Sequence, residues 1–135
     1  MTTFDFEDGN GPVPAHRHIN PDGTEGGWVA DTAYVADTCY VCPDARVFGK
    51  AQVYDDAMVF DNAQVSGFAQ VFGNALIYGD SWVLGNAQIY GNARVTGDAR
   101  VFDNSRVFDD AWVDDVWVYG DAQISGYARV TGDRK

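Results

Sequence analysis

Basic residues and histidine are scarce in this 135-residue chain. Its 9 Lys and Arg stand against 20 Asp and Glu, which gives a formal net charge of −11, and it contains only 2 His. Nucleic acid and anionic membrane surfaces repel a chain with this charge. We therefore expect neither nucleic acid nor a membrane among its partners.

Cysteine is also scarce, and long apolar runs are absent. The two cysteines, Cys39 and Cys42, are too few for the disulfide framework of a small secreted domain. The first ten residues, MTTFDFEDGN, are acidic and lack the basic and apolar regions of a signal peptide. No apolar run approaches the length of a membrane-spanning helix. We expect a cytoplasmic protein, located in the host cytoplasm if a phage encodes it.

Apolar residues as a class are abundant. Hydrophobic residues make up 46% of the chain and aromatic residues 14%, which is too much for a disordered segment. The length is that of one ordinary domain. The composition therefore predicts a single folded domain.

A six-residue repeat dominates the chain from residue 29 onward. An aliphatic residue recurs every six positions from Val29 to Val113 and, after one five-residue step, at Val118, Ile124 and Val130. The unit reads A-x-V-x-[GD]-[ND]. Alternation in A-x-V points Ala and Val inward, and Gly, Asp and Asn tolerate the positive φ of a sharp corner. Eighteen such units predict about six stacked coils of three short parallel strands, spaced roughly 4.8 Å apart.

The repeat resembles that of a known fold family. The units I-Y-G-N-A-R (89–94) and V-T-G-D-A-R (95–100) are similar to the hexapeptide repeat of left-handed parallel β-helix proteins. This resemblance covers about residues 28 to 133. It implies an all-β fold, a left-handed parallel β-helix that forms a three-faced solenoid of about six coils. We divide the chain into an irregular N-terminal capping segment, 1–27, and a hexapeptide-repeat β-helix, 28–135.

The outward positions of the coils carry many aromatic side chains. A monomer would expose more apolar surface than scattered residues explain, so we expect a homo-oligomer. The predicted interface residues are Phe60, Phe72, Leu76, Tyr78, Tyr90 and Trp112. Hexapeptide proteins are commonly trimers packed side by side, so the resemblance implies a homotrimer, and an end-to-end dimer is the alternative.

The segment His16-Arg17-His18 is the best candidate for a small-ligand site, because it combines titratable bases with an anion donor. On an extended strand both histidines would share one face, as a metal pair could. The alternative is that they form hydrogen bonds within the cap. Cys39 and Cys42 point to opposite sides of their strand, so we expect no metal or redox role for them.

Acidic residues gather at the predicted corners. Turn chemistry and solubility explain them, and a surface for cations or for a basic protein is the alternative.

The expected function is that of a non-catalytic, oligomeric β-helix interaction and binding module without metal or cofactor. One form of it is a phage or bacterial protein that captures a host protein or a small ligand. The alternative implied by the resemblance is a hexapeptide-type acyltransferase with a CoA-like donor and His16 or His18 as base. The chain departs from that pattern, because no histidine lies in the coils. A second alternative is an acidic mimic of nucleic acid, although a 4.8 Å charge spacing matches the roughly 3.4 Å rise of a duplex poorly.

Overall fold

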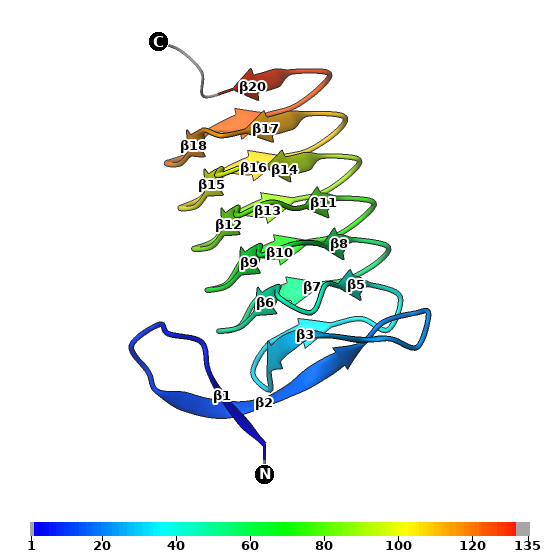
Figure 1. Cartoon of the computed structure of the whole chain (residues 1–135). Helices are drawn as coiled ribbons and strands as arrows, with labels where there is room; N and C mark the ends of the chain where they lie inside the picture. The colour runs from blue at the N-terminus through cyan, green and yellow to red at the C-terminus, as the bar shows by residue number, and fades with distance from the viewer. Residues whose placement is uncertain (1, 132–135) are drawn as a thin grey trace.

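The computed structural model describes residues 2–131 and contains 20 β-strands in three sheets (Figure 1). No helix occurs among these residues. Residue 1 and residues 132–135, which include the end of the predicted repeat domain and the predicted corner residue Asp133, lie outside the described part of the chain.

Each sheet forms one face of a column of coils. Face 1 contains β1 (Thr3–Asp5), β2 (Pro12–Ile19), β3 (Glu25–Ala30), β6 (Arg46–Val47), β9 (Gln64–Val65), β12 (Trp82–Val83), β15 (Arg100–Val101) and β18 (Trp117–Val118). Face 2 contains β4 (Tyr34–Val35), β7 (Gln52–Val53), β10 (Gln70–Val71), β13 (Gln88–Ile89), β16 (Arg106–Val107) and β19 (Gln123–Ile124). Face 3 contains β5 (Tyr40–Val41), β8 (Met58–Val59), β11 (Leu76–Ile77), β14 (Arg94–Thr96), β17 (Trp112–Asp114) and β20 (Arg129–Thr131).

Every coil strand pairs in parallel with the strand three units later. Val47 is opposite Val65, and Val83 is opposite Val101. The backbone bonds between coils are regular, with Phe48 N donating to Val65 O at 3.0 Å. Apart from β1 and β2 of face 1, each face has six strands, which gives six coils that rise from β3 to β20 in Figure 1. This confirms the prediction of an all-β, three-faced parallel solenoid of about six coils.

The interior of the column is made by the Ala and Val positions of the repeat. Most of these side chains have no exposed surface, and Ile77 and Ile89 are the largest of them. Burying a side chain such as Val or Ile stabilises the fold by roughly 1.5–3 kcal/mol. Ser81 and Ser105 replace Ala at two buried positions, and their hydroxyls donate to Tyr78 O at 2.8 Å and to Phe102 O at 2.7 Å.

The corners use Asp as well as Gly at a position of positive φ. Asp55 and Asp61 have φ of 60° and 55°. Their carboxylates accept hydrogen bonds from the backbone N–H of Gly73 and Gly79 in the next coil, both at 3.0 Å. These bonds offset part of the cost of the left-handed conformation. The acidic corners therefore have a structural function in joining coils.

One corner is a residue shorter than the others. The chain passes from β17 to β18 through Asp115 and Val116, yet Val101 still pairs with Val118. Asp115 Oδ1 accepts from Asp98 N at 2.8 Å, which ties the short corner to the preceding coil. The five-residue step removes a corner residue and leaves the strand register unchanged.

The N-terminal segment is more regular than the sequence predicted. The expected irregular cap forms strands β1 and β2, and β3 begins at Glu25, so the predicted boundary at 27 falls inside a strand. β1 pairs with β2, and β2 with β3, in antiparallel fashion. The two added strands extend face 1 below the first coil in Figure 1. Backbone pairing along β3 gives the segment this regularity.

The cap also forms a second, small core outside the coils. Phe4 stacks on Trp28 with ring centroids 4.8 Å apart, and Phe6 stacks on Phe48 at the same distance. Phe48 is therefore buried, although its outward position in the repeat predicted exposure. Arg46 Nη1 joins the cap to face 1 through Glu7 Oε1 at 2.9 Å.

Candidate functional site

The structure does not bring His16 and His18 together. His16 is exposed, and its Nδ1 forms a hydrogen bond with Asp31 Oδ1 at 2.8 Å. His18 is buried, and its Nε2 donates to Cys39 O at 2.7 Å. A register shift in β2 between Arg17 and Ile19 breaks the alternation that would have put both rings on one face. Each histidine therefore contacts a different part of the fold.

Arg17 and Asn20 form further contacts at the junction of the cap and the first coil. Arg17 Nη1 donates to Gly26 O at 3.0 Å, and its guanidinium lies 5.1 Å from the centre of the Trp28 ring. Asn20 is buried, and its Oδ1 accepts from Val41 N at 2.8 Å. Sequence reasoning singled out Arg17 and missed Asn20, since an isolated Asn before Pro reads as a turn residue.

The two cysteines flank β5 and differ in burial. Cys39 is fully buried at an Ala position of the core, and Cys42 is half-buried; both are free thiols. Burial raises the pKa of the Cys39 thiol above its usual value. Cys39 is therefore a core residue in the described chain.

An apolar patch covers the N-terminal half of face 3. We call it the face-3 patch, and its members are the outward residues Tyr40, Met58, Phe60, Leu76 and Tyr78. Met58 is 37% exposed, whereas the other members are half-buried. The rings of Phe60 and Tyr78 are tilted by 61° with centroids 6.4 Å apart, so they cover one another poorly. Three predicted interface residues, Phe60, Leu76 and Tyr78, lie in this patch.

The C-terminal half of face 3 has a different character. Trp112, another predicted interface residue, lies between two guanidinium groups: Arg94 is 5.5 Å and Arg129 4.2 Å from the centre of its ring. Trp112 Nε1 also donates to Thr96 Oγ1 at 2.9 Å. Trp112 is therefore held by its own chain, and exposed arginines flank it.

On face 2 the outward aromatic rings form an ordered column. We call it the face-2 ladder; it consists of Tyr54, Phe72, Tyr90 and Phe108. Successive centroids are 4.9, 4.9 and 5.1 Å apart, and the interplanar angles are 2–4°. The predicted interface residues Phe72 and Tyr90 are thus its two central rings. Stacked rings of this kind stabilise a sheet, so the column contributes to the stability of face 2.

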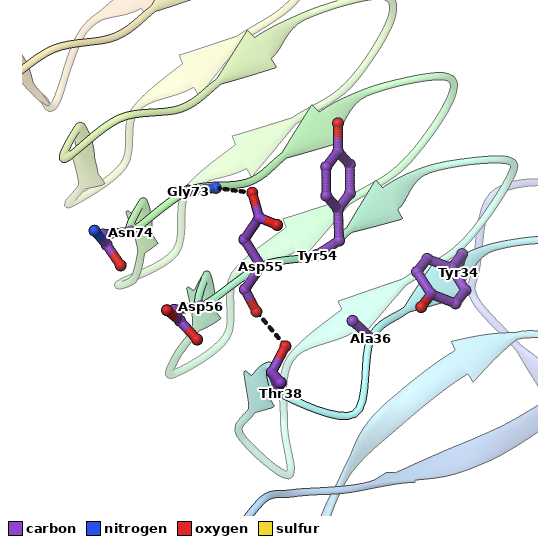
Figure 2. Close-up of a pocket in the computed structure, with 8 residues that line it drawn as sticks. All are labelled: Tyr34, Ala36, Thr38, Tyr54, Asp55, Asp56, Gly73 and Asn74. Atoms are coloured by element: carbon purple, nitrogen blue, oxygen red, sulfur yellow. Dashed lines mark hydrogen bonds between the residues drawn. The ribbon is translucent and has the colours of Figure 1, made fainter.

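A groove lies at the N-terminal end of the face-2 ladder. It has a volume of about 640 Å³. Figure 2 shows Tyr54 at its centre, with Tyr34 and Ala36 on one side of it and the corner residues on the other. The residues that line it are Tyr34, Ala36, Thr38, Tyr54, Asp55, Asp56, Gly73 and Asn74.

Two carboxylates make the corner side of this groove acidic. Asp55 is fixed by its bond to Gly73 N, and its backbone carbonyl accepts a hydrogen bond from Thr38 Oγ1 (Figure 2). Asp56 is exposed. Burial, together with the negative charge of Asp55, raises the pKa of Tyr54 above its usual value. The Tyr54 ring therefore stays neutral around neutral pH.

The sequence carried a signal for the groove. Ala36 takes the place in the ladder column where the next coils have Tyr54, Phe72, Tyr90 and Phe108, because β4 pairs in register with β7. A small residue at the end of an aromatic column leaves one ring uncovered. Ala36, Tyr54, Phe72, Tyr90 and Phe108 recur at intervals of eighteen in the sequence, so the position of the gap can be found there.

The described residues contain neither a cluster of metal ligands nor a membrane-spanning helix. Across residues 2–131 no group of three or more His, Cys, Asp or Glu side chains is arranged to hold a metal ion. No helix in this part of the chain is long and apolar enough to cross a membrane.

Comparison with known proteins agrees with the coil geometry. The family model of the YdcK β-solenoid repeat matches residues 51–67, 69–85 and 87–101, which is less than half of the chain. Each matched segment contains three consecutive strands, from β7–β9 to β13–β15, and so corresponds to one coil.

The chain is a β-solenoid repeat protein. No curated protein and no solved structure matches it. The narrower assignment of this solenoid to the hexapeptide-repeat proteins stays a prediction.

Proposed function

We propose that this β-solenoid is a non-catalytic binding module that works as a side-by-side homo-oligomer, with the face-3 patch at the contact between copies. The observation that carries the proposal is the patch itself. It places Met58 and Leu76, without any formal charge, among aromatic rings that cover each other incompletely. Contiguous apolar surface of this kind is typical of contact sites between proteins.

The charge distribution favours a second copy of the chain as the partner. The corner between face 3 and face 1 carries exposed carboxylates such as Asp80 and Asp98, whereas face 3 itself carries the exposed Arg94 and Arg129. A second copy therefore supplies an acidic edge for the arginines. In a closed ring each copy offers face 3 to one neighbour and an acidic edge to the other, which is a heterologous contact. We favour the trimer among such rings.

The contacts of the histidines limit the acyltransferase alternative. His18 is buried against Cys39 O, and His16 is paired with Asp31. His18 is therefore unavailable as the base of the acyltransferase alternative. His16 is exposed and its Nε2 lies outside the bond with Asp31, so that alternative depends on His16 alone.

Light scattering coupled to size-exclusion chromatography tests the proposal. The native protein should have about three times the chain mass of 14.7 kDa at micromolar concentration. Leu76→Glu should weaken association by about 30-fold or more, because a charge would be buried in the contact. Gln64→Glu adds the same charge at the equivalent position of face 1 and should leave the mass unchanged. A native monomer, or equal masses for the two variants, would contradict the proposal.

A further inference from the structure

The face-2 ladder has an uncovered ring at each end, Tyr54 next to Ala36 and Phe108 next to Ser125. Its four rings repeat at the spacing of the coils, about 4.9 Å, and are nearly parallel. Beyond Tyr54 the next position in the column is Ala36, so no ring of the described chain stacks on that side of Tyr54. One more ring would continue the ladder at this point.

The groove around this vacant position has room for a planar molecule. Its volume of about 640 Å³ lies within the range of small-molecule sites. Tyr34, which is 56% exposed, stands beside Ala36 and gives the groove a second aromatic wall (Figure 2). A ring seated over Ala36 would contact Tyr54 with its face and Tyr34 at its side.

The charges around the groove favour a positively charged ligand. Asp55 and Asp56 line it, and none of its lining residues is basic. The electron-rich face of a tyrosine attracts cations as well as other rings. An anionic ring would meet two carboxylates on a chain whose net charge is already −11.

We propose that this groove binds a planar aromatic cation, which stacks on Tyr54 as the fifth ring of the face-2 ladder and directs its positive charge toward Asp55 and Asp56. The ligand class is a one- or two-ring heteroaromatic system with a fixed or protonated nitrogen. The site lies on face 2 and needs no second copy of the chain. It is therefore independent of the oligomer proposed through face 3.

The test uses three small probes and isothermal titration calorimetry. N-methylquinolinium has both ring and positive charge, naphthalene-2-sulfonate has the ring with negative charge, and tetramethylammonium has the charge without a ring. We expect saturable binding of N-methylquinolinium and affinities at least about tenfold weaker for the other two, because each lacks one of the two interactions. Equal binding of tetramethylammonium and N-methylquinolinium would overturn the proposal, as would the absence of saturable binding.

Variants at the two ends of the ladder provide a matched pair. Ala36→Phe fills the vacant position with a ring of the protein and should reduce N-methylquinolinium affinity at least about tenfold. Ser125→Phe makes the same kind of change beyond Phe108, at the other open end of the column. That end lacks an equivalent of Tyr34 and has the exposed Arg106 beside it, so Ser125→Phe should leave the affinity unchanged. Equal effects of the two variants would overturn the proposal.

Two further variants keep the test decisive. Tyr54→Leu removes the stacking surface and should also abolish binding, which covers the case in which Ala36→Phe does not fold. Asp56→Asn should weaken binding severalfold and reduce its dependence on salt. The Leu76→Glu variant should bind N-methylquinolinium as the native protein does, so failure of the oligomer would be distinguishable from failure of this site.

Discussion

At the scale of single residues, the corner aspartates explain why so acidic a chain folds into closely stacked coils. Asp103 and Asp109 have φ near 60°, as Asp61 does, and their carboxylates accept from the N–H of Gly120 and Gly126 at 3.0 Å. An L-residue in this conformation costs roughly 1–2 kcal/mol, and the hydrogen bond offsets part of it. Negative charge at these positions therefore follows from backbone geometry.

Substitutions at Asp61 test this role. Asp61→Asn keeps a carbonyl acceptor and a residue that tolerates positive φ, so its stability should stay within about 0.5 kcal/mol of the native protein. Asp61→Ala loses both properties and should lower the free energy of unfolding by about 1–3 kcal/mol. Urea denaturation followed by circular dichroism measures the difference. Asp44→Ala, at the neighbouring corner position, controls for loss of one charge. Equal stability of the two Asp61 variants would show that the carboxylate bond is unimportant.

At the scale of elements, the strands of the coils could be predicted from the sequence, whereas the strands of the cap could not. The coil strands follow from a period that is visible along the chain, and each inward side chain packs against the same position one coil away. In the cap, Pro12 and Pro14 suggested irregular chain. Both lie in the part of β2 that pairs only with β1, where a missing N–H is tolerated at an edge.

Only part of the candidate site could be predicted from the sequence. The aromatic columns were visible as residues recurring at intervals of eighteen, and the structure places Phe72 and Tyr90 in the face-2 ladder. The separation of His16 from His18 was not, because it depends on a register shift within β2 that no local pattern marks. Long-range pairing of one strand decided that outcome.

The hydrogen bond between Asn20 in the cap and Val41 in β5 predicts that substitution of Asn20 has a local effect on stability. Asn20→Ala removes the acceptor for Val41 N, a buried backbone donor, and should cost about 1–3 kcal/mol. Hydrogen exchange at the Val41 amide should become faster, while exchange in β10 and β13 should stay unchanged. Asn10→Ala, an exposed asparagine of the β1–β2 turn, is the matched control. Unchanged protection of Val41 in Asn20→Ala would contradict this account of the cap.

At the scale of the whole molecule, charge is sorted between edges and faces. From β4 onward, Asp114 is the only carboxylate at an outward strand position of the described coils, whereas those positions include Arg46, Arg94, Arg100 and Arg129. The remaining coil carboxylates stand at the corners. The molecule therefore presents three negative edges separated by faces that are neutral or positive.

This sorting predicts that salt stabilises the fold. Raising NaCl from about 20 mM to about 0.5 M shortens the screening length from about 20 Å to about 4 Å and weakens repulsion along each edge. We expect stability to rise by about 1 kcal/mol, or a few degrees in Tm by calorimetry. A double variant, Asp80→Asn with Asp98→Asn, should start from a higher Tm and respond less. A Tm that falls with salt would mean that arginine contacts on the faces outweigh repulsion at the edges.

The short corner at Asp115 shows that the strand pairing between coils does not fix the number of residues in a coil. Val101 and Val118 are partners although the chain between them is one residue shorter than a full turn of the repeat. A change of length at an edge therefore stays local and does not shift the residues that follow into the wrong environment. Insertions and deletions at the corners are the changes that such a chain can accumulate most easily, and new loops would arise there without altering the column that carries them.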